Sequence, residues 1–207
     1  MNRLEQLFQK SPQAATFAGE YLKYVSEVLS NIDAASIAAF VDVLLQAREC
    51  GTRVFFIGNG GSAATASHFA NDIAIGCRSW ERPFRATSLT DNVSVMTAVA
   101  NDYGYDKIFT MQLQTLLEPG DVVVAISASG NSPNVVSAVE WANAHGAKTV
   151  ALTGFDGGKL RTIAQINVHV PTNKGEYGPV EDAHMVLDHL IGSFLMQRCR
   201  AEVSVEA

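Results

Sequence analysis

The chain has 207 residues, a net charge of -6, 47% hydrophobic residues and only 17% charged residues. This length suits one domain with a sizeable core, and the low share of charge suggests that other chains cover part of the surface. No run of Lys or Arg is present, which argues against direct binding to nucleic acid or to an anionic membrane. Cys50, Cys77 and Cys199 form no C-x-x-C pair. Such cysteines suit a reducing compartment. We find neither a signal peptide nor a long apolar span, so we expect a cytoplasmic protein.

The first 50 residues are predicted to form a pair of helices. Residues 13–31 carry an apolar stripe, and Asp33 can cap a second helix that contains Phe40 and Leu44. Because the pair precedes the first strand, we expect it to lie outside the central sheet and to serve oligomerisation, as part of the same domain. The alternative is that both helices pack on their own domain.

From residue 53 onward, short apolar strands alternate with helices. The strand candidates are residues 53–57, 84–89, 122–126, 148–153 and 166–170, and the main helix candidates are 63–74, 93–100, 107–117, 134–145 and 181–198. This alternation predicts an α/β fold, a three-layer sandwich around a five-stranded parallel sheet. Ligands of such sheets bind beyond the carboxyl ends of the strands.

The turn from Ser127 to Pro133 follows the most apolar strand candidate and precedes a helix. Ser132 suits the N-cap of that helix and Pro133 its first position. Three hydroxyl groups and the free N–H groups of a helix N-terminus would gather around one point, and such a place receives a phosphate or another compact anion. Serine, glycine and asparagine also form ordinary turns, so a purely structural role is the alternative.

A second glycine-rich turn, Gly58-Asn59-Gly60-Gly61-Ser62-Ala63, formally satisfies the fingerprint of dinucleotide-binding enzymes. That fingerprint also requires an acidic residue at the end of the second strand. Glu81 lies in a polar turn before this strand, and the strand ends in Ser88-Leu89. We therefore interpret the glycines as bringing the backbone close to a smaller ligand, which Asn59 and Ser62 would hydrogen-bond.

Titratable residues occur on two of the predicted helices. His68 and Asp72 are four residues apart and so share a helix face, which by itself is typical of a surface ion pair or a core histidine. The terminal helix carries polar groups among apolar ones: Glu181, Asp182, His184, Asp188 and His189. Such a helix is expected to be mostly buried and to face a cavity, because buried carboxylates and imidazoles are costly without a function or a bound ion. A solvated helix face is the alternative.

In combination these motifs resemble the sugar isomerase (SIS) domain and, within it, the phosphoheptose isomerase group. The residues that carry the resemblance are Gly58–Ser62, His68–Ala70, Ala100–Gly104, Ile126–Ser132, Leu152–Gly158 and His184 with His189. The resemblance implies an SIS domain at residues 51–200 with flavodoxin-like strand order, after N-terminal helices at 1–50, and a homotetramer. It implies conversion of sedoheptulose 7-phosphate to D-glycero-D-manno-heptose 7-phosphate through an enediol, which supplies heptose for lipopolysaccharide or capsule.

The same resemblance assigns roles to individual residues. Asp72 and His189 would be the catalytic acid and base, and His68, Asp72, Glu181 and His189 would bind zinc. The implied substrate-binding residues are Asn59, Gly60, Gly61, Ser62, Asn101, Asp102, Ser127, Ala128, Ser129, Ser132 and Glu181.

Three positions depart from the pattern of the group. Asp72 stands in place of a glutamate, Glu181 in place of a glutamine, and Gly76 in place of an arginine for which Arg78 is a candidate substitute. Glu181 and His189 are eight residues apart, about 12 Å along a helix, so they converge only if Glu181 lies at or before the first helical turn. These departures leave two alternatives open, an isomerase of a different phosphosugar and a non-catalytic adaptor that binds a replication initiator protein.

Overall fold

The computed structural model describes residues 1–206 and has a five-stranded parallel sheet at its centre. The strands are β1 (Arg53–Gly58), β2 (Arg85–Ser88), β3 (Val122–Ser127), β4 (Lys148–Thr153) and β5 (Ile166–His169). Their order in the sheet is β2-β1-β3-β4-β5, which is flavodoxin-like and confirms the predicted fold class. The order reverses between β1 and β3, so the edge beyond the carboxyl ends of these two strands is where a ligand is expected.

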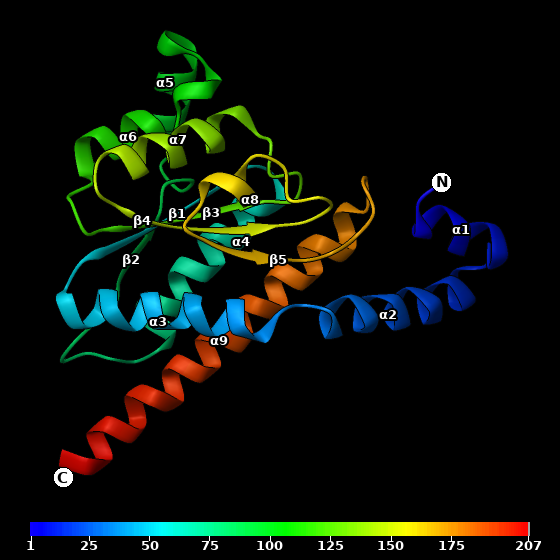
Figure 1. Ribbon diagram of the computed structural model, residues 1–207, viewed down its shortest axis with the longest axis horizontal. Helices are drawn as coiled ribbons and strands as arrows, with labels where there is room; N and C mark the ends of the chain where they lie inside the picture. The colour runs from blue at the N-terminus through cyan, green and yellow to red at the C-terminus, as the bar shows by residue number, and fades with distance from the viewer. Residues whose placement is uncertain (207) are drawn as a thin grey trace.

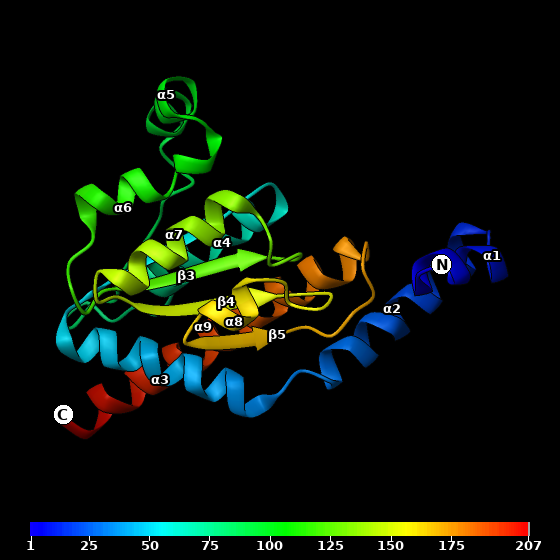
Figure 2. The same cartoon turned by 45° about the horizontal axis from the view of Figure 1, so that its top comes forward.

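Helices cover both faces of the sheet (Figures 1 and 2). One layer contains α3 (Ala34–Cys50), α4 (Gly61–Asn71) and α9 (Tyr177–Glu206), and the other contains α6 (Thr110–Leu116), α7 (Pro133–Ala144) and the short α8 (Leu160–Ile163). Alternate side chains of β1 enter different cores, since Val54 and Phe56 belong to the first and Phe55 and Ile57 to the second. The molecule is therefore the predicted three-layer sandwich.

The remaining helices extend from this body. α1 (Arg3–Lys10) lies at the far end of α2 (Ala14–Ser30), and α5 (Val93–Tyr103) projects beyond α6 and α7 (Figure 1). α3 packs in the core through Phe40 and Leu44, and a role of the N-terminal helices in oligomerisation stays a prediction. Among the described residues no single helix is long and apolar enough to cross a membrane, and α2 with α3 reaches that length only as a pair bent by 69°.

Three element boundaries differ from the sequence prediction. α5 continues through Asn101 and Asp102, which were expected to break it, and ends at Gly104, whose φ of 97° stops the helix. α9 begins at Tyr177 rather than near Glu181, because Pro179 falls in the first helical turn, where its missing N–H is not needed. α4 ends in a π-helical turn, Asp72–Gly76, where a regular helix was expected. A π turn holds one residue more than an α turn and is frequent at functional sites.

A buried carboxylate, that of Glu176, ties the N-terminal helices to the start of α9. It accepts hydrogen bonds from the Tyr24 hydroxyl and from the backbone N–H groups of Arg3, at 2.6 Å, and Asn173, at 2.9 Å. Burial alone would raise the pKa of Glu176, but these hydrogen bonds together hold it below its ordinary value. One carboxylate thus joins α1, α2 and the loop that leads into α9.

We expect Glu176→Gln to lower the free energy of unfolding by about 1 to 3 kcal/mol, because the amide replaces a charged acceptor of several hydrogen bonds. A folded-state pKa below the ordinary 4.5 means that this contribution is present above pH 4.5 and is lost as the pH falls through the folded value. Urea unfolding at several pH values measures both effects. The exposed Glu81, changed to Gln, is the control. An equal loss in both variants, or a difference that persists at low pH, would contradict the prediction.

Candidate active site

The two glycine- and serine-bearing turns meet at the carboxyl edge of the sheet. β1 and β3 are neighbours, with Gly58 aligned with Ile126, so the turns that follow them lie side by side. Between them is a cavity of about 150 Å³. Its lining consists of Asn59, Ser62, Ile126, Ser127, Ala128, Ser129, Ser132, Tyr177 and Glu181. The structure thus brings together most of the substrate-binding residues that the sequence predicted.

Ser132 occupies the N-cap position of α7, but its side chain does not cap the helix. Its hydroxyl lies 3.4 Å from that of Ser127, and the side chain of Asn134 accepts from the N–H of Val135 instead, at 3.0 Å. The Ser132 hydroxyl is therefore left for a ligand at the positive end of α7, where anions are stabilised.

The loop after β4 supports the serine turn from behind. The N–H of Leu160 donates to the carbonyl of Gly130 at 3.0 Å, and that of Gly154 donates to the carbonyl of Ala128 at 2.9 Å. Gly130 has a φ of 63°, and a Cβ there would lie 1.9 Å from the carbonyl oxygen of Gly157. Only glycine fits at this position, so the serine hydroxyls are positioned by backbone packed against backbone.

Asn59 is fixed from two sides. It exchanges two hydrogen bonds of 2.8 Å with the side chain of Asn134 and accepts a third, of 3.0 Å, from the hydroxyl of Tyr105. Both polar groups of its amide are thereby used within the protein. Asn59 shapes the wall of the cavity in this structure, and a direct contact with substrate stays a prediction.

Glu181 reaches this same cavity and lies far from His189. It is in the second turn of α9, and its carboxylate rests against Gly61 at the start of α4, where a Cβ would lie 2.3 Å from Oε2. The missing side chain of Gly61 thus makes room for a carboxylate at the positive end of α4. Because α9 begins before Glu181, the condition for convergence with His189 is not met.

A second group of side chains gathers where α4 and α9 pack against each other. It consists of His68, Asp72, Asp188 and His189, each of which offers a ligand atom within 4.8 Å of those of the others. Nε2 of His68 lies 3.2 Å from Nε2 of His189, 3.5 Å from Oδ2 of Asp72 and 3.8 Å from Oδ2 of Asp188. Three of the four predicted ligands therefore meet, and in the described part of the chain Asp188, not Glu181, is the fourth member.

The chemistry of this group fits a divalent metal ion. Asp188 is fully buried, and neither of its carboxylate oxygens has a hydrogen-bond partner among the described residues. Burial raises the pKa of Asp188 to about 7, and the nearby Asp72 carboxylate adds to the rise. Two imidazoles and two carboxylates are a donor set that zinc accepts, and a cation would pair a charge that is otherwise costly to bury.

A cavity of about 290 Å³ opens beside this group. It is lined by Asp72, Gly76, His189, Gly192, Ser193 and Met196. A Cβ at Gly76 or at Gly192 would lie 3.7 Å from the side chain of Asp72, so the two glycines leave the space next to this carboxylate open. The cavity offers the reacting end of a small molecule access to Asp72 and His189 together.

Some residues singled out from the sequence lie elsewhere. Asn101 donates to Asp102 at 2.7 Å on α5, the helix that projects from the body (Figure 2). Arg78 is exposed, with a left-handed φ of 53°, and lines a different cavity with Trp80 and Cys199. In the described residues, neither Asn101, Asp102 nor Arg78 lines the cavity of the serine turn or the cavity beside Asp72.

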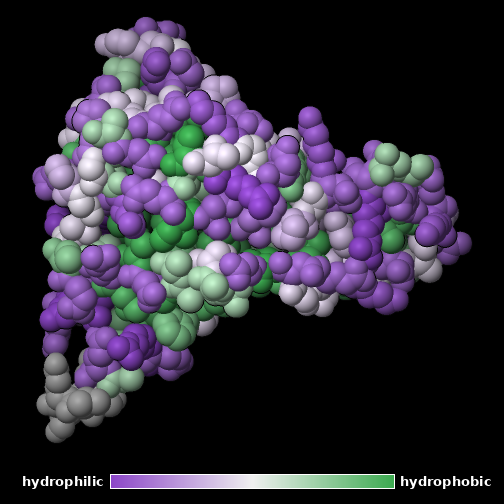
Figure 3. Space-filling model, in the orientation of Figure 1, coloured by the Kyte–Doolittle hydropathy of each residue, from purple (hydrophilic) through white to green (hydrophobic). Residues whose placement is uncertain are grey.

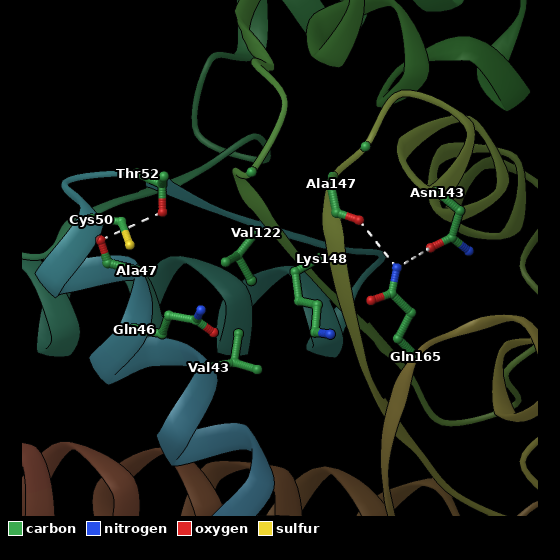
Figure 4. A pocket seen from close by; sticks show the side chains of 12 residues that line it. Val43, Gln46, Ala47, Cys50, Thr52, Val122, Asn143, Ala147, Lys148 and Gln165 are labelled. Atoms are coloured by element: carbon green, nitrogen blue, oxygen red, sulfur yellow. Dashed lines mark hydrogen bonds between the residues drawn. The ribbon is translucent and has the colours of Figure 1, made fainter.

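A larger cavity, of about 430 Å³, lies at the opposite end of the sheet (Figure 4). It is lined by the first residues of β3 and β4, Val122 and Lys148, together with part of α3. The amide of Gln165 donates there to Asn143 and to the carbonyl of Ala147, both at 3.2 Å. This is the amino end of the strands, so we assign the site to the carboxyl end instead.

Sequence comparison places the chain among known proteins. Residues 20–154 match the family described as the SIS domain. The phosphoheptose isomerase of Geobacter metallireducens is 41% identical over 155 residues, which cover 75% of this chain and 81% of that protein. The probable phosphoheptose isomerase of Thermoplasma acidophilum is 35% identical over 181 residues, 87% of this chain and 98% of that one.

Solved structures agree with this placement. The phosphoheptose isomerase from Neisseria gonorrhoeae superimposes with a TM-score of 0.76 at 32% identity, over 88% of this chain and 95% of that one. The enzyme from Francisella tularensis gives a TM-score of 0.79 at 27% identity, over 89% and 99%. Both the sequence and the fold match over most of the chain, which therefore belongs to the SIS-domain family and, within it, to the phosphoheptose isomerases.

Proposed function

We propose that this chain is an aldose–ketose isomerase that converts sedoheptulose 7-phosphate to D-glycero-D-manno-heptose 7-phosphate. The observation that carries this proposal is the placement of a hydroxyl-lined cavity and an imidazole–carboxylate group at the two ends of α4. Ser62 and Asp72 are ten residues apart, about 15 Å along a helix. A sugar with its phosphate at one end and its carbonyl at the other can reach both places.

The phosphate end of the substrate would lie in the cavity between the two turns. We assign the hydroxyls of Ser127, Ser129 and Ser132 and the backbone of Ala128 to the phosphate, since hydroxyl and N–H donors at a helix N-terminus favour an anion. The wall opposite would be formed by Asn59, Gly60, Gly61 and Ser62.

The reacting end would lie beside Asp72 and His189. The isomerisation removes a proton from C1 of the ketose, delivers one to C2 and moves the hydroxyl proton from O1 to O2, so no oxidant or reductant is consumed. We assign Asp72 to one carbon and His189 to the other. Nε2 of His189 lies 3.2 Å from Nε2 of His68, which positions the two rings against each other. Because its Nε2 faces His68, we assign the proton exchanged with substrate to the other ring nitrogen of His189, Nδ1.

The group around His68 would hold zinc, which in such a position polarises the carbonyl and hydroxyl oxygens of the sugar. The carboxylate of Asp72 has two oxygens, so it can be a ligand through one and approach the substrate through the other. The presence of Asp72 in this group supports an enzyme over the adaptor that the sequence left open. The free state of Cys50, Cys77 and Cys199 supports a cytoplasmic location, and the product would serve an envelope polysaccharide.

A homotetramer is the assembly that we propose. α9 carries exposed apolar side chains at a spacing of four residues, Val186, Leu190 and Phe194, on the face that does not enter the core. Apolar surface also gathers over and beside α3 (Figure 3). Helices that extend from the body, α2 and α5, offer further surface to neighbouring subunits (Figure 1), and α5 would bring Asn101 and Asp102 to them.

Asp72→Asn tests the chemical assignment. We expect kcat for sedoheptulose 7-phosphate to fall by a factor of about 10² to 10⁴, because the amide cannot take up a proton. The dissociation constant of inorganic phosphate should change less than about twofold, since Ser62, which lines the phosphate cavity, lies about 15 Å from Asp72 along α4. Product formation by NMR and calorimetric titration with phosphate measure the two effects. Asp42→Asn, an exposed carboxylate on α3, is the control. An undiminished kcat would remove Asp72 from the mechanism.

Gly130→Ala tests the phosphate site. The new Cβ would meet the Gly157 carbonyl and strain the backbone, so we expect phosphate to bind more than about tenfold more weakly, a loss of about 1.4 kcal/mol. Gly19→Ala is the matched control, because that position is open and helical and should gain about 0.5 to 1 kcal/mol of stability. Unchanged phosphate affinity in a folded Gly130→Ala protein would show that the serine turn does not bind the phosphate.

The double change Leu190→Asp and Phe194→Asp tests the assembly. Two charges on the exposed stripe of α9 should dissociate the tetramer toward the 22.2 kDa monomer in light-scattering chromatography. Leu116→Asp introduces a charge at an exposed leucine on α6, in the other helix layer, and should leave the mass unchanged. A wild-type protein that runs as a monomer would refute the tetramer directly.

A further inference from the structure

Asp188 occupies a position on α9 where the fold calls for an apolar side chain. The residues that face the core from this helix recur every three or four positions and include Ala183, Leu187, Ile191 and Leu195, all nearly or fully buried. Asp188 lies within this buried stripe and is itself 0% exposed. Aspartate is almost never fully buried without a partner, so its presence here needs a compensating interaction.

The described residues do not provide that interaction. Neither oxygen of Asp188 accepts a hydrogen bond within the described part of the chain. Nε2 of His68 lies 3.8 Å from Oδ2 of Asp188, which is at the limit of an ion-pair contact. The carboxylate of Asp72 lies in the same group and has the same charge, so it adds repulsion. His184, one turn earlier on the buried stripe, also has both ring nitrogens unpartnered and does not bond Asp188. What the site lacks is a positive charge.

The distances from His68 to the other three side chains are close to those in the coordination shell of a zinc ion, and all four ligand atoms lie within 4.8 Å of one another. For metal–ligand distances of about 2.0 to 2.2 Å, neighbouring ligands of a tetrahedral ion are about 3.3 to 3.6 Å apart. Nε2 of His68 lies 3.2, 3.5 and 3.8 Å from its neighbours in His189, Asp72 and Asp188. Each helix supplies two ligands: His68 and Asp72 come from one face at the end of α4, and Asp188 and His189 approach from adjacent directions on α9.

We propose that Asp188 is a metal ligand of this chain, so that the ion is held by His68, Asp72, Asp188 and His189, and Glu181 stays in the phosphate cavity. This assignment deepens the proposed function, since the ion would serve the same reactive end. Two carboxylates balance the charge of a divalent cation, and the buried one becomes neutralised by the ion it binds. Glu181 lies two turns before Asp188 on α9, and its carboxylate rests against Gly61. It is therefore too far from His189 to be the fourth ligand within the same chain.

The test compares the zinc affinity of the wild-type protein with that of three isosteric variants, Asp188→Asn, Glu181→Gln and Asp42→Asn. It does not depend on turnover. With zinc at about a hundred times its dissociation constant, the wild-type protein should melt about 5 to 10 °C higher than without the ion. Asp188→Asn should lose that shift and bind zinc more than about a hundredfold more weakly in chelator competition. The metal-free variant should melt at a higher temperature than the metal-free wild type, because an unpaired buried carboxylate is gone. Glu181→Gln and Asp42→Asn should keep the wild-type zinc affinity.

Two results would overturn the assignment: zinc affinity in Asp188→Asn within threefold of wild type, or a loss in Glu181→Gln that Asp188→Asn does not show. Anomalous diffraction from zinc-soaked wild-type crystals decides the matter independently, even where Asp188→Asn fails to fold. An ion about 2.0 to 2.2 Å from a carboxylate oxygen of Asp188 supports the proposal, and an ion more than about 3 Å from both oxygens, or no bound ion, refutes it. A protein that binds zinc in this way and still fails to turn over sedoheptulose 7-phosphate would refute the proposed function alone.

Discussion

The close packing of α4 against α9 is the constraint on which the site depends. Both helices lie on the same face of the sheet (Figure 1) and contact each other, and the core on this face includes the small buried residues Ala66, Ala70 and Ala183. At one end of this contact Gly61 receives the carboxylate of Glu181, and at the other His68 meets His189. One helix pair therefore fixes the distance between the cavity of the serine turn and the group around His68 and His189.

The neighbouring positions of the two turns could be predicted from the sequence because they depend on local rules. A buried strand followed by Ser127–Ser132 and a helix determines where hydroxyls and N–H groups point, and the parallel sheet places the Gly58–Ser62 turn next to it. The meeting of His68 with His189 was implied by resemblance alone, since no spacing rule links residues 121 positions apart. The fold supplied that contact.

The roles of Glu181 and Asp188 depended on a boundary that the sequence places poorly. A start of α9 near residue 181 would have let Glu181 reach His189, whereas the start at Tyr177 lengthens the helix by a full turn and holds them apart. The signal for Asp188 was present: residues 183, 187, 191 and 195 mark a core stripe that includes position 188. A carboxylate on a core stripe is a stronger indication of function than one on an exposed face, because only the buried one requires a partner.

Two of the three departures from the pattern of the phosphoheptose isomerases, Asp72 and Gly76, lie at one end of the candidate site, and the third, Glu181, lies in the cavity beside the serine turn. Asp72 is shorter than the expected glutamate, the π turn that begins there holds an extra residue, and Gly76 opens the cavity where an arginine was expected. Asp188 adds a carboxylate at the same point. Such changes are consistent with each other when one compensates another. A shorter carboxylate at Asp72 is compensated by a second carboxylate nearby, and the π turn changes the backbone at the place where the arginine would stand. The serine turn itself keeps the pattern of the group, so the departures affect the group around Asp72 and the Glu181 wall of the cavity rather than the proposed phosphate-binding hydroxyls.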